Sequence, residues 1–202
     1  KNYKKNLIQL LFLVLIVFFT NSYFNYENSL IFGGSDGRYY LLISEYAPDF
    51  GINIEYIKGE RFFFPYLNGI IFNLGFGDLY LLYQVTSIIL VIILIFLFHE
   101  ILILSKIDKY TIYIALLLVI FNPYLIRYYL AVPTIVIDLC FIISLEIISL
   151  GFLKKQKKFL YLGLILAALS RQNSIIILFV FFLFKFFFKD KSIFKYIDLP
   201  LI

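Results

Sequence analysis

The chain has 202 residues, of which 62% are hydrophobic and only 15% are charged, and its mean hydropathy is +0.94. Soluble domains carry about 25% charged residues, so this composition argues against a soluble globular protein and predicts an integral membrane protein. The net charge of +5 comes from lysines at the ends of apolar segments, so it does not indicate nucleic-acid binding. The single cysteine, Cys140, excludes an intrachain disulfide, and the single histidine, His99, excludes a zinc site built from histidine and cysteine.

Seven apolar segments follow one another along the chain without the alternation typical of strands, and each predicts a helix. In chain order the predicted ranges are Leu7–Thr20 (extending to Phe24), Phe62–Leu74, Leu79–Leu104, Tyr110–Asn122, Val132–Phe152, Phe159–Leu169 and Ile175–Phe188. A bilayer core takes about 20 residues of helix. No small-residue cleavage site follows the first segment, which favours an uncleaved anchor over a signal peptide. We therefore expect an all-α, polytopic transmembrane helical bundle that forms a single membrane domain over residues 1–202.

Lysines predict how the bundle is oriented. All but Lys58 form four clusters: Lys1, Lys4 and Lys5; Lys106 and Lys109; Lys154, Lys155, Lys157 and Lys158; and Lys185, Lys189, Lys191 and Lys195. The positive-inside rule places all four clusters on the cytoplasmic side. Lys106 and Lys109 can lie there only if Phe62–Leu74 does not cross the membrane. Because this segment is short and contains Gly69, we expect a partial or interfacial helix; the less favoured alternative is that Lys106 and Lys109 violate the rule.

This orientation makes residues 21–61 an extracytoplasmic loop. Its centre is the run Gly33-Gly34-Ser35-Asp36-Gly37-Arg38-Tyr39-Tyr40. The glycines beside Asp36 permit a tight backbone. We expect a short interfacial helix over Arg38–Tyr46, with Glu45 toward water and three residues toward lipid, namely Leu41, Leu42 and Ile43. Asp36 is then either a general base or metal ligand at the membrane surface or the N-cap of that helix, and local sequence does not separate the two.

All four arginines fall outside or at the outer membrane edge: Arg38, Arg61, Arg127 and Arg171. The guanidinium group offers a planar fork that binds phosphate through two hydrogen bonds and keeps its charge. For Arg38 and Arg61, beside Asp36 and Pro65, this favours a site for a phosphate-bearing lipid. For Arg127 and Arg171, snorkelling of the side chain to the interface is an equal alternative.

A carboxylate within the predicted helix Val132–Phe152, Asp138, lies about two turns below the outer face. Carboxylates in the membrane are costly and usually functional, so we expect Asp138 to line the site, with a structural ion pair to Arg127 or Arg171 as the alternative. Three further residues are expected to line the site: Tyr39, Tyr40 and Gln172. The two tyrosines are equally well explained as interfacial anchors. Three other polar residues are interpreted as packing or inner-interface groups: His99, Glu100 and Glu146.

The order of these elements resembles the membrane glycosyltransferases of the GT-C superfamily, especially the polyprenyl-phosphate-sugar-dependent enzymes related to protein mannosyltransferases and aminoarabinose transferases. The resemblance covers roughly Leu7 to Phe188 and rests on these matches: Asp36–Tyr46, Arg61 with Pro65, Asn122-Pro123, Asp138, and Ser170-Arg171-Gln172. It implies that Asp36 is the catalytic aspartate of the first outer loop. It also implies basic side chains around a lipid phosphate, for which Arg61 and Arg171 are candidates. Because Gly37 replaces the second acid of the Asp-Asp or Asp-Glu pair found in some branches, no cofactor is certain and a divalent metal stays an open expectation.

The resemblance thus implies transfer of a sugar from a polyprenyl-phosphate donor to a glycan, lipid or protein acceptor on the extracytoplasmic side. The alternatives are a glycan polymerase or ligase, a transporter of lipid-linked sugars, and a truncated inactive remnant. A transporter should show inverted repeats, and no convincing repeat is present. The composition and the lack of a sorting motif favour a bacterial inner membrane. Since methionine is absent and a new apolar segment starts at the end of the chain, we expect a fragment of a longer GT-C module.

Overall fold

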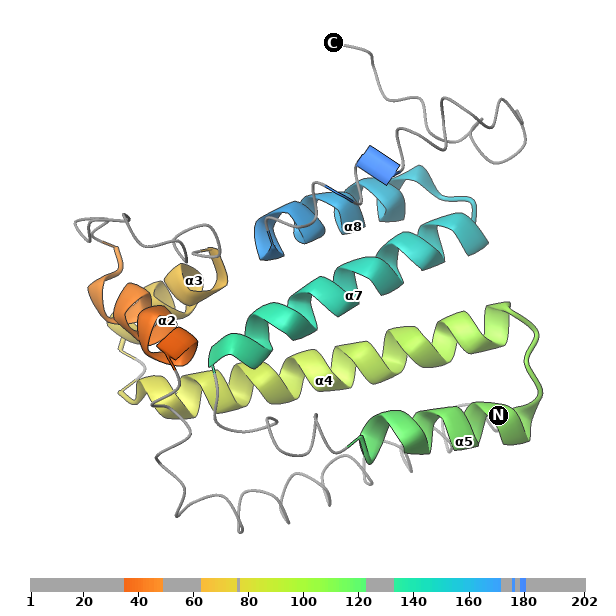
Figure 1. Cartoon of the computed structure of the whole chain (residues 1–202), viewed down its shortest axis with the longest axis horizontal. Coiled ribbons are helices and arrows are strands. Elements are labelled where there is room, and N and C mark those ends of the chain that lie inside the picture. The colour runs from red at the N-terminus through yellow and green to blue at the C-terminus, as the bar shows by residue number, and fades with distance from the viewer. Residues whose placement is uncertain are drawn as a thin grey trace.

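The computed structural model describes residues 35–48, 63–75, 77–122 and 133–171, together with 176, 179 and 180. The first predicted helix and nearly all of the last lie outside these ranges. Within them the chain forms helices and no strands, in agreement with the all-α prediction. The helices are α2 (Ser35–Tyr46), α3 (Phe63–Asn73), α4 (Leu79–Leu104), α5 (Lys109–Ile120), α7 (Pro133–Leu153) and α8 (Lys157–Ser170) (Figure 1).

Two of the described helices are long and apolar enough to cross a membrane. They are α4 over Leu81–Leu104, with 24 residues, and α7 over Val136–Leu153, with 18 residues. At 11 residues, α3 is about 16 Å long, which is about half of a bilayer core and fits a partial helix. α5 and α8, with 12 and 14 residues, lie close to the predicted ranges Tyr110–Asn122 and Phe159–Leu169, and both are shorter than a full bilayer span.

The helices are arranged around α4 and α7, which run side by side in the same direction (Figure 1). α5 folds back along α4, and α8 folds back along α7. α2 and α3 pack together across the end where α4 and α7 begin, and we call this the α2–α3 end. The opposite end holds the turns from α4 to α5 and from α7 to α8. We call it the lysine end, after its residues Lys106, Lys109, Lys154, Lys155, Lys157 and Lys158.

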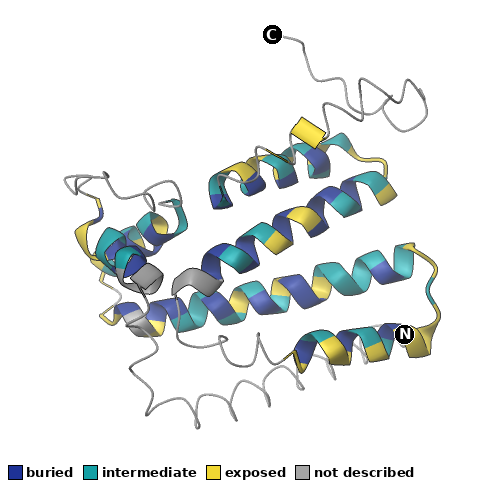
Figure 2. Ribbon diagram, in the orientation of Figure 1, coloured by how far each residue is buried: buried dark blue, intermediate teal, exposed yellow. Residues whose placement is uncertain are grey.

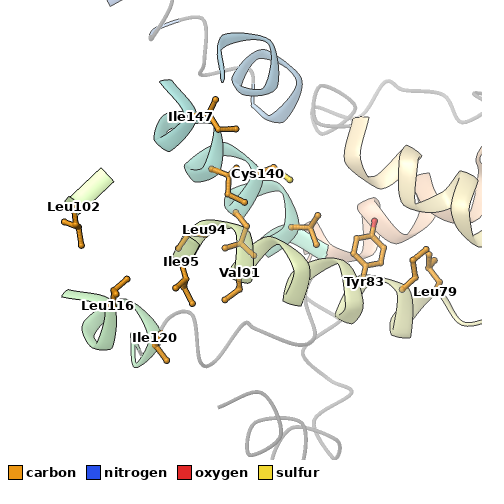
Figure 3. Close-up of a cluster of buried hydrophobic side chains, with 14 of the residues drawn as sticks. Leu79, Tyr83, Val91, Leu94, Ile95, Leu102, Leu116, Ile120, Cys140 and Ile147 are labelled. Atoms are coloured by element: carbon orange, nitrogen blue, oxygen red, sulfur yellow. The ribbon is translucent and has the colours of Figure 1, made fainter. Parts of the chain in front are cut away.

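The core lies mainly between α4, α5 and α7 (Figure 3). The α7 residues of this core recur every three or four positions, which is the spacing of one helix face: Val136, Leu139, Cys140, Ile143 and Ile147. The outward faces are apolar as well, with exposed side chains that include Ile89, Ile93 and Phe96 of α4 and Ile114 and Leu118 of α5 (Figure 2). A helix that is apolar on all sides is typical of a bilayer or a protein core, and no described helix buries these outer faces.

Small residues let α7 and α8 approach closely. A Cβ atom added at Gly163 of α8 would lie 2.6 Å from Ile148 Cγ1 and 2.8 Å from the Ser144 carbonyl oxygen of α7. A Cβ added at Gly151 would meet the backbone nitrogen of Leu160 at 2.8 Å. Between helices in lipid, where hydrophobic burial gives little net gain, such close van der Waals contact is a main source of stability.

Asp108 begins α5 as its N-cap, in the turn outside the apolar helices. Its carboxylate accepts hydrogen bonds from the backbone N–H groups of Tyr110 and Thr111, both at 3.0 Å, and from the Thr111 hydroxyl. The Thr111 hydroxyl is the main cause, with the backbone bonds, of a pKa for Asp108 below its ordinary value of 3.8. Because the folded pKa is lowered, the stabilisation from ionised Asp108 is present at neutral pH and is lost as the pH falls below 3.8 through the folded pKa.

We therefore expect Asp108→Ala to lower the melting temperature at pH 7, because two N–H groups of α5 lose their acceptor. The difference in melting temperature between wild type and variant should shrink at acid pH, since protonation of the Asp108 carboxylate weakens the cap in the wild type. Thermal unfolding of both proteins between pH 7 and pH 3 measures this. A difference that is independent of pH would contradict a role for the ionised carboxylate.

Candidate functional site

The Ser44 hydroxyl joins α2 to α3 and α4 at the α2–α3 end. It lies 2.7 Å from the Pro65 carbonyl oxygen of α3 and 2.7 Å from the Tyr83 hydroxyl of α4. A serine hydroxyl has one proton, for which the Pro65 carbonyl and, at 3.0 Å, the Tyr40 carbonyl of its own helix are the acceptors, so Tyr83 donates to Ser44. Ser44 and Tyr83 are both buried, so these bonds are shielded from competing solvent. Three helices are thereby tied together through a single hydroxyl group.

Contacts between α2 and α3 continue past Ser44. A Cβ atom added at Gly69 of α3 would lie 2.2 Å from the Ser44 carbonyl oxygen and 2.7 Å from the Ala47 Cβ, so only glycine permits this approach. The Asn73 side-chain amide donates to the Ala47 carbonyl, and the Tyr66 hydroxyl donates to the Pro48 carbonyl at 3.0 Å. α3 thus supplies partners for carbonyl groups that the end of α2 leaves without intrahelical bonds.

One sequence prediction about α2 is wrong. Leu41 was expected to face lipid on an interfacial helix, whereas it is 8% exposed and packs in the core shared with α4 and α7. Tyr40, expected to line the site or anchor the interface, is fully buried. The physical reason is that Ser44 and Tyr83 satisfy each other's hydroxyl groups, so a polar face of α2 is buried at little cost.

On the same end of the bundle, Arg171 and Asp138 form an ion pair between α8 and α7. Arg171 Nη2 lies 2.9 Å from Asp138 Oδ1, and the two side chains are 30% and 25% exposed. The guanidinium carbon also lies 5.8 Å from the centre of the Phe141 ring, one turn below Asp138. α8 ends at Ser170, and the backbone of Arg171 is extended, as expected for a turn at this position. The carboxylate and the ring therefore orient the guanidinium from two sides.

The structure places the other predicted site residues only in part. Asp36 is the second residue of α2 and Arg38 the fourth, and their side chains are outside what the structure describes. Because α2 begins at Ser35, Asp36 lies in the first turn, where the helix dipole favours a carboxylate. Tyr39 is half-buried. Three residues lie outside the described ranges: Arg61, Arg127 and Gln172.

The elements that carry these residues do meet. α2 packs against α7, the helix of Asp138, and α3 packs against α8, the helix that Arg171 ends. Of the two alternatives for Asp138, the ion pair is present, with Arg171 as the partner. Both side chains also keep part of their surface accessible to a bound molecule.

Sequence reasoning missed Tyr83, Ser44 and Phe141. Tyr83 lies in an apolar segment that includes Tyr80. Local sequence does not distinguish a tyrosine whose hydroxyl anchors the membrane interface from one whose hydroxyl is hydrogen-bonded in the interior. Phe141 follows Asp138 by three positions, so the helical period was the one available signal that both share a face.

Within residues 35–171, excluding the undescribed segments, no group of three His, Cys, Asp or Glu side chains is placed to hold a metal ion. Comparison with protein-family models, curated proteins and solved structures gave no match to the chain. The candidate site is therefore defined by its own geometry: a partly open Arg171–Asp138 pair on helices that contact α2 and α3.

Proposed function

We propose that this chain is a multi-pass membrane glycosyltransferase of the GT-C type, which transfers a sugar from a polyprenyl-phosphate donor to an acceptor on the extracytoplasmic side of a bacterial inner membrane. The observation that supports it best is the Arg171–Asp138 pair, at 2.9 Å and partly exposed. The pair lies at the end of the bundle where α2, which carries Asp36, packs on α7. The lysines of the described turns lie at the other end, as the positive-inside rule requires for an extracytoplasmic site.

The proposed reaction divides between two charged groups. The Asp36 carboxylate takes the proton of the acceptor hydroxyl as the acceptor oxygen forms its bond to the anomeric carbon. The bond between that carbon and the phosphate oxygen breaks, and the lipid phosphate leaves with the electron pair. Arg171 stabilises the charge that develops on the phosphate, since a fixed guanidinium needs no reorientation during the reaction.

Asp138 has a positioning role in this scheme. It occupies one edge of the guanidinium, through Nη2, and keeps the side chain from extending into solvent. Phe141 lies against the same group at 5.8 Å, within the range of a cation–π contact. A phosphate can reach Arg171 without displacing the Asp138 carboxylate, because about a third of the Arg171 side chain is accessible.

The test is a transfer assay on membranes that contain the 202-residue chain, with a panel of radiolabelled polyprenyl-phosphate sugars. We expect release of labelled sugar from at least one donor. Arg171→Gln should lower kcat/KM by about 10²-fold or more, the cost typical of losing one charge-stabilising donor. Arg171→Lys should retain part of the activity, because it keeps the charge and loses the fork.

Membrane extraction and thermal unfolding of each variant serve as controls for insertion and folding. An inserted wild-type chain that releases no sugar from any donor contradicts the proposed function. Transfer that proceeds equally well in Arg171→Gln removes Arg171 from the phosphate site.

A further inference from the structure

Among the described residues of the lysine end, lysines outnumber acids. Lys154 Nζ pairs with Glu100 Oε1 at 2.9 Å, which also joins the end of α7 to the end of α4. Asp108 is used as the cap of α5. These two acids are thus engaged within the fold. Of the other lysines at this end, four are exposed: Lys106, Lys109, Lys155 and Lys158.

Two of these lysines occupy a backbone conformation that disfavours them. α4 and α7 both end in a Schellman motif: Lys106 N–H bonds to the Ile103 carbonyl and the next N–H to Leu102, and the same pattern recurs around Lys155. Lys106 and Lys155 have φ values of 58° and 54°, in the left-handed region. Glycine is the usual residue at this position, because a Cβ atom is strained there. Stability of the turns therefore does not explain a lysine at either position.

Other lysines oppose a helix dipole. Lys109 is the first residue of α5, and Lys157 and Lys158 are the first two of α8. The N-terminus of a helix carries partial positive charge, so cations are disfavoured in the first turn. Lys109 Nζ lies 5.6 Å from the Tyr113 ring centre, and Lys158 Nζ lies 5.5 Å from the Phe159 ring centre. Both ammonium groups thus lie within the range of a cation–π contact, and both side chains are exposed at the surface.

We propose that the lysine end binds anionic phospholipid headgroups of the cytosolic leaflet, with Lys106 and Lys155 as principal contacts. Exposed apolar side chains of the adjacent helices, such as Leu153, border the cluster and mark the level at which lipid tails begin. Phosphodiester oxygens at that level carry the negative charge that attracts exposed ammonium groups. Each lysine near such a surface strengthens the binding by a similar factor. The inference rests on the membrane embedding proposed above and is independent of sugar transfer.

The test compares phosphatidylglycerol with phosphatidylcholine on the purified chain in detergent, with retained lipid measured by native mass spectrometry. We expect the wild type to prefer phosphatidylglycerol. The double variant Lys106→Gly/Lys155→Gly should weaken that binding by about 5-fold per lysine, or roughly 25-fold in total. Its melting temperature in phosphatidylcholine should equal or exceed that of the wild type, because glycine relieves both left-handed turns. Raising the ionic strength to about 1 M should abolish the preference.

The matched control is Lys106→Arg/Lys155→Arg, which keeps both charges and both strained turns and should bind phosphatidylglycerol as the wild type does. Equal binding of the two lipids by the wild type would overturn the inference. The lysines would then act only as topology signals or bind an acidic protein. Unchanged phosphatidylglycerol binding in the glycine variant would overturn it too, as would a lower melting temperature, which would make the lysines structural. Loss of sugar transfer without loss of lipid preference would affect only the proposed function.

Discussion

Asp36→Asn is expected to abolish sugar transfer while the protein still inserts and folds. Asparagine has almost the same size as aspartate but cannot accept the acceptor's proton, and losing a general base typically costs about 10²–10⁴-fold in rate. Asp36 lies at the start of α2, ahead of the residues that attach this helix to the bundle, so the exchange leaves those contacts untouched. The measurement is kcat for transfer from the polyprenyl-phosphate donor to the acceptor, together with a melting curve.

Asp78→Asn provides a matched control. Asp78 lies just before α4 at the same end of the bundle, and its Oδ1 accepts from the Leu81 N–H at 3.3 Å, a bond that asparagine can also accept. The same chemical change there should leave transfer unchanged. If Asp36→Asn turns over like the wild type, or if both exchanges lower the rate equally, Asp36 is not the base.

The second large effect is expected from Gly69→Ala. The added methyl group would lie 2.2 Å from the Ser44 carbonyl oxygen and 2.7 Å from the Ser44 Cα, so α2 must move away from α3. Overpacking of this kind typically costs about 1–3 kcal/mol. Displacement also breaks the bond between Ser44 and the Pro65 carbonyl and moves the first turn of α2, with Asp36, relative to Arg171. We therefore expect loss of transfer together with a lower melting temperature.

Gly77→Ala is the matched control for this exchange. Gly77 is close in sequence to Gly69 at the same end of the bundle, but a Cβ atom added there meets nothing within 4 Å. Its φ is compatible with an L side chain, so neither stability nor transfer should fall. The variant should still be recovered in the membrane fraction, and cross-linking should show that its α7–α8 contact is kept. Together these results would show that Gly69→Ala displaces α2 rather than unfolding the bundle. Full activity in Gly69→Ala would mean that the docking of α2 does not position the reaction.

The sequence predicts the helices of the described region well because apolar runs and their breaks are local signals. The predicted range Leu79–Leu104 is identical to α4, and α5, α7 and α8 begin and end within a few residues of prediction. The break at Asn122-Pro123 and the turn at Arg171 are where described helices stop. The residue before a proline is disfavoured in the helical conformation, and this constraint is local, so it needs no tertiary information.

Pairing between helices could not be predicted in the same way. The Ser44–Tyr83 bond joins residues 39 positions apart, and a serine on a short helix beside a membrane is expected to face water. Gly69 was interpreted as a break in an apolar segment, whereas it is the point at which α3 meets the α2 backbone. For Asp138 the partner was restricted to two arginines, and the structure pairs it with Arg171 because α8 packs back along α7.

The close contact of α7 and α8 at Gly163 and Ser144 affects the ion pair between Arg171 and Asp138. Gly163 precedes Arg171 by eight residues, about 12 Å along the helix axis. A larger side chain at Gly163 would therefore tilt α8 and displace its end. A tilt of a few degrees is enough to lengthen a 2.9 Å contact beyond the range of a charged hydrogen bond. Tolerance for larger side chains at Gly163 is thus limited by the required position of a guanidinium group two turns away, as well as by packing itself.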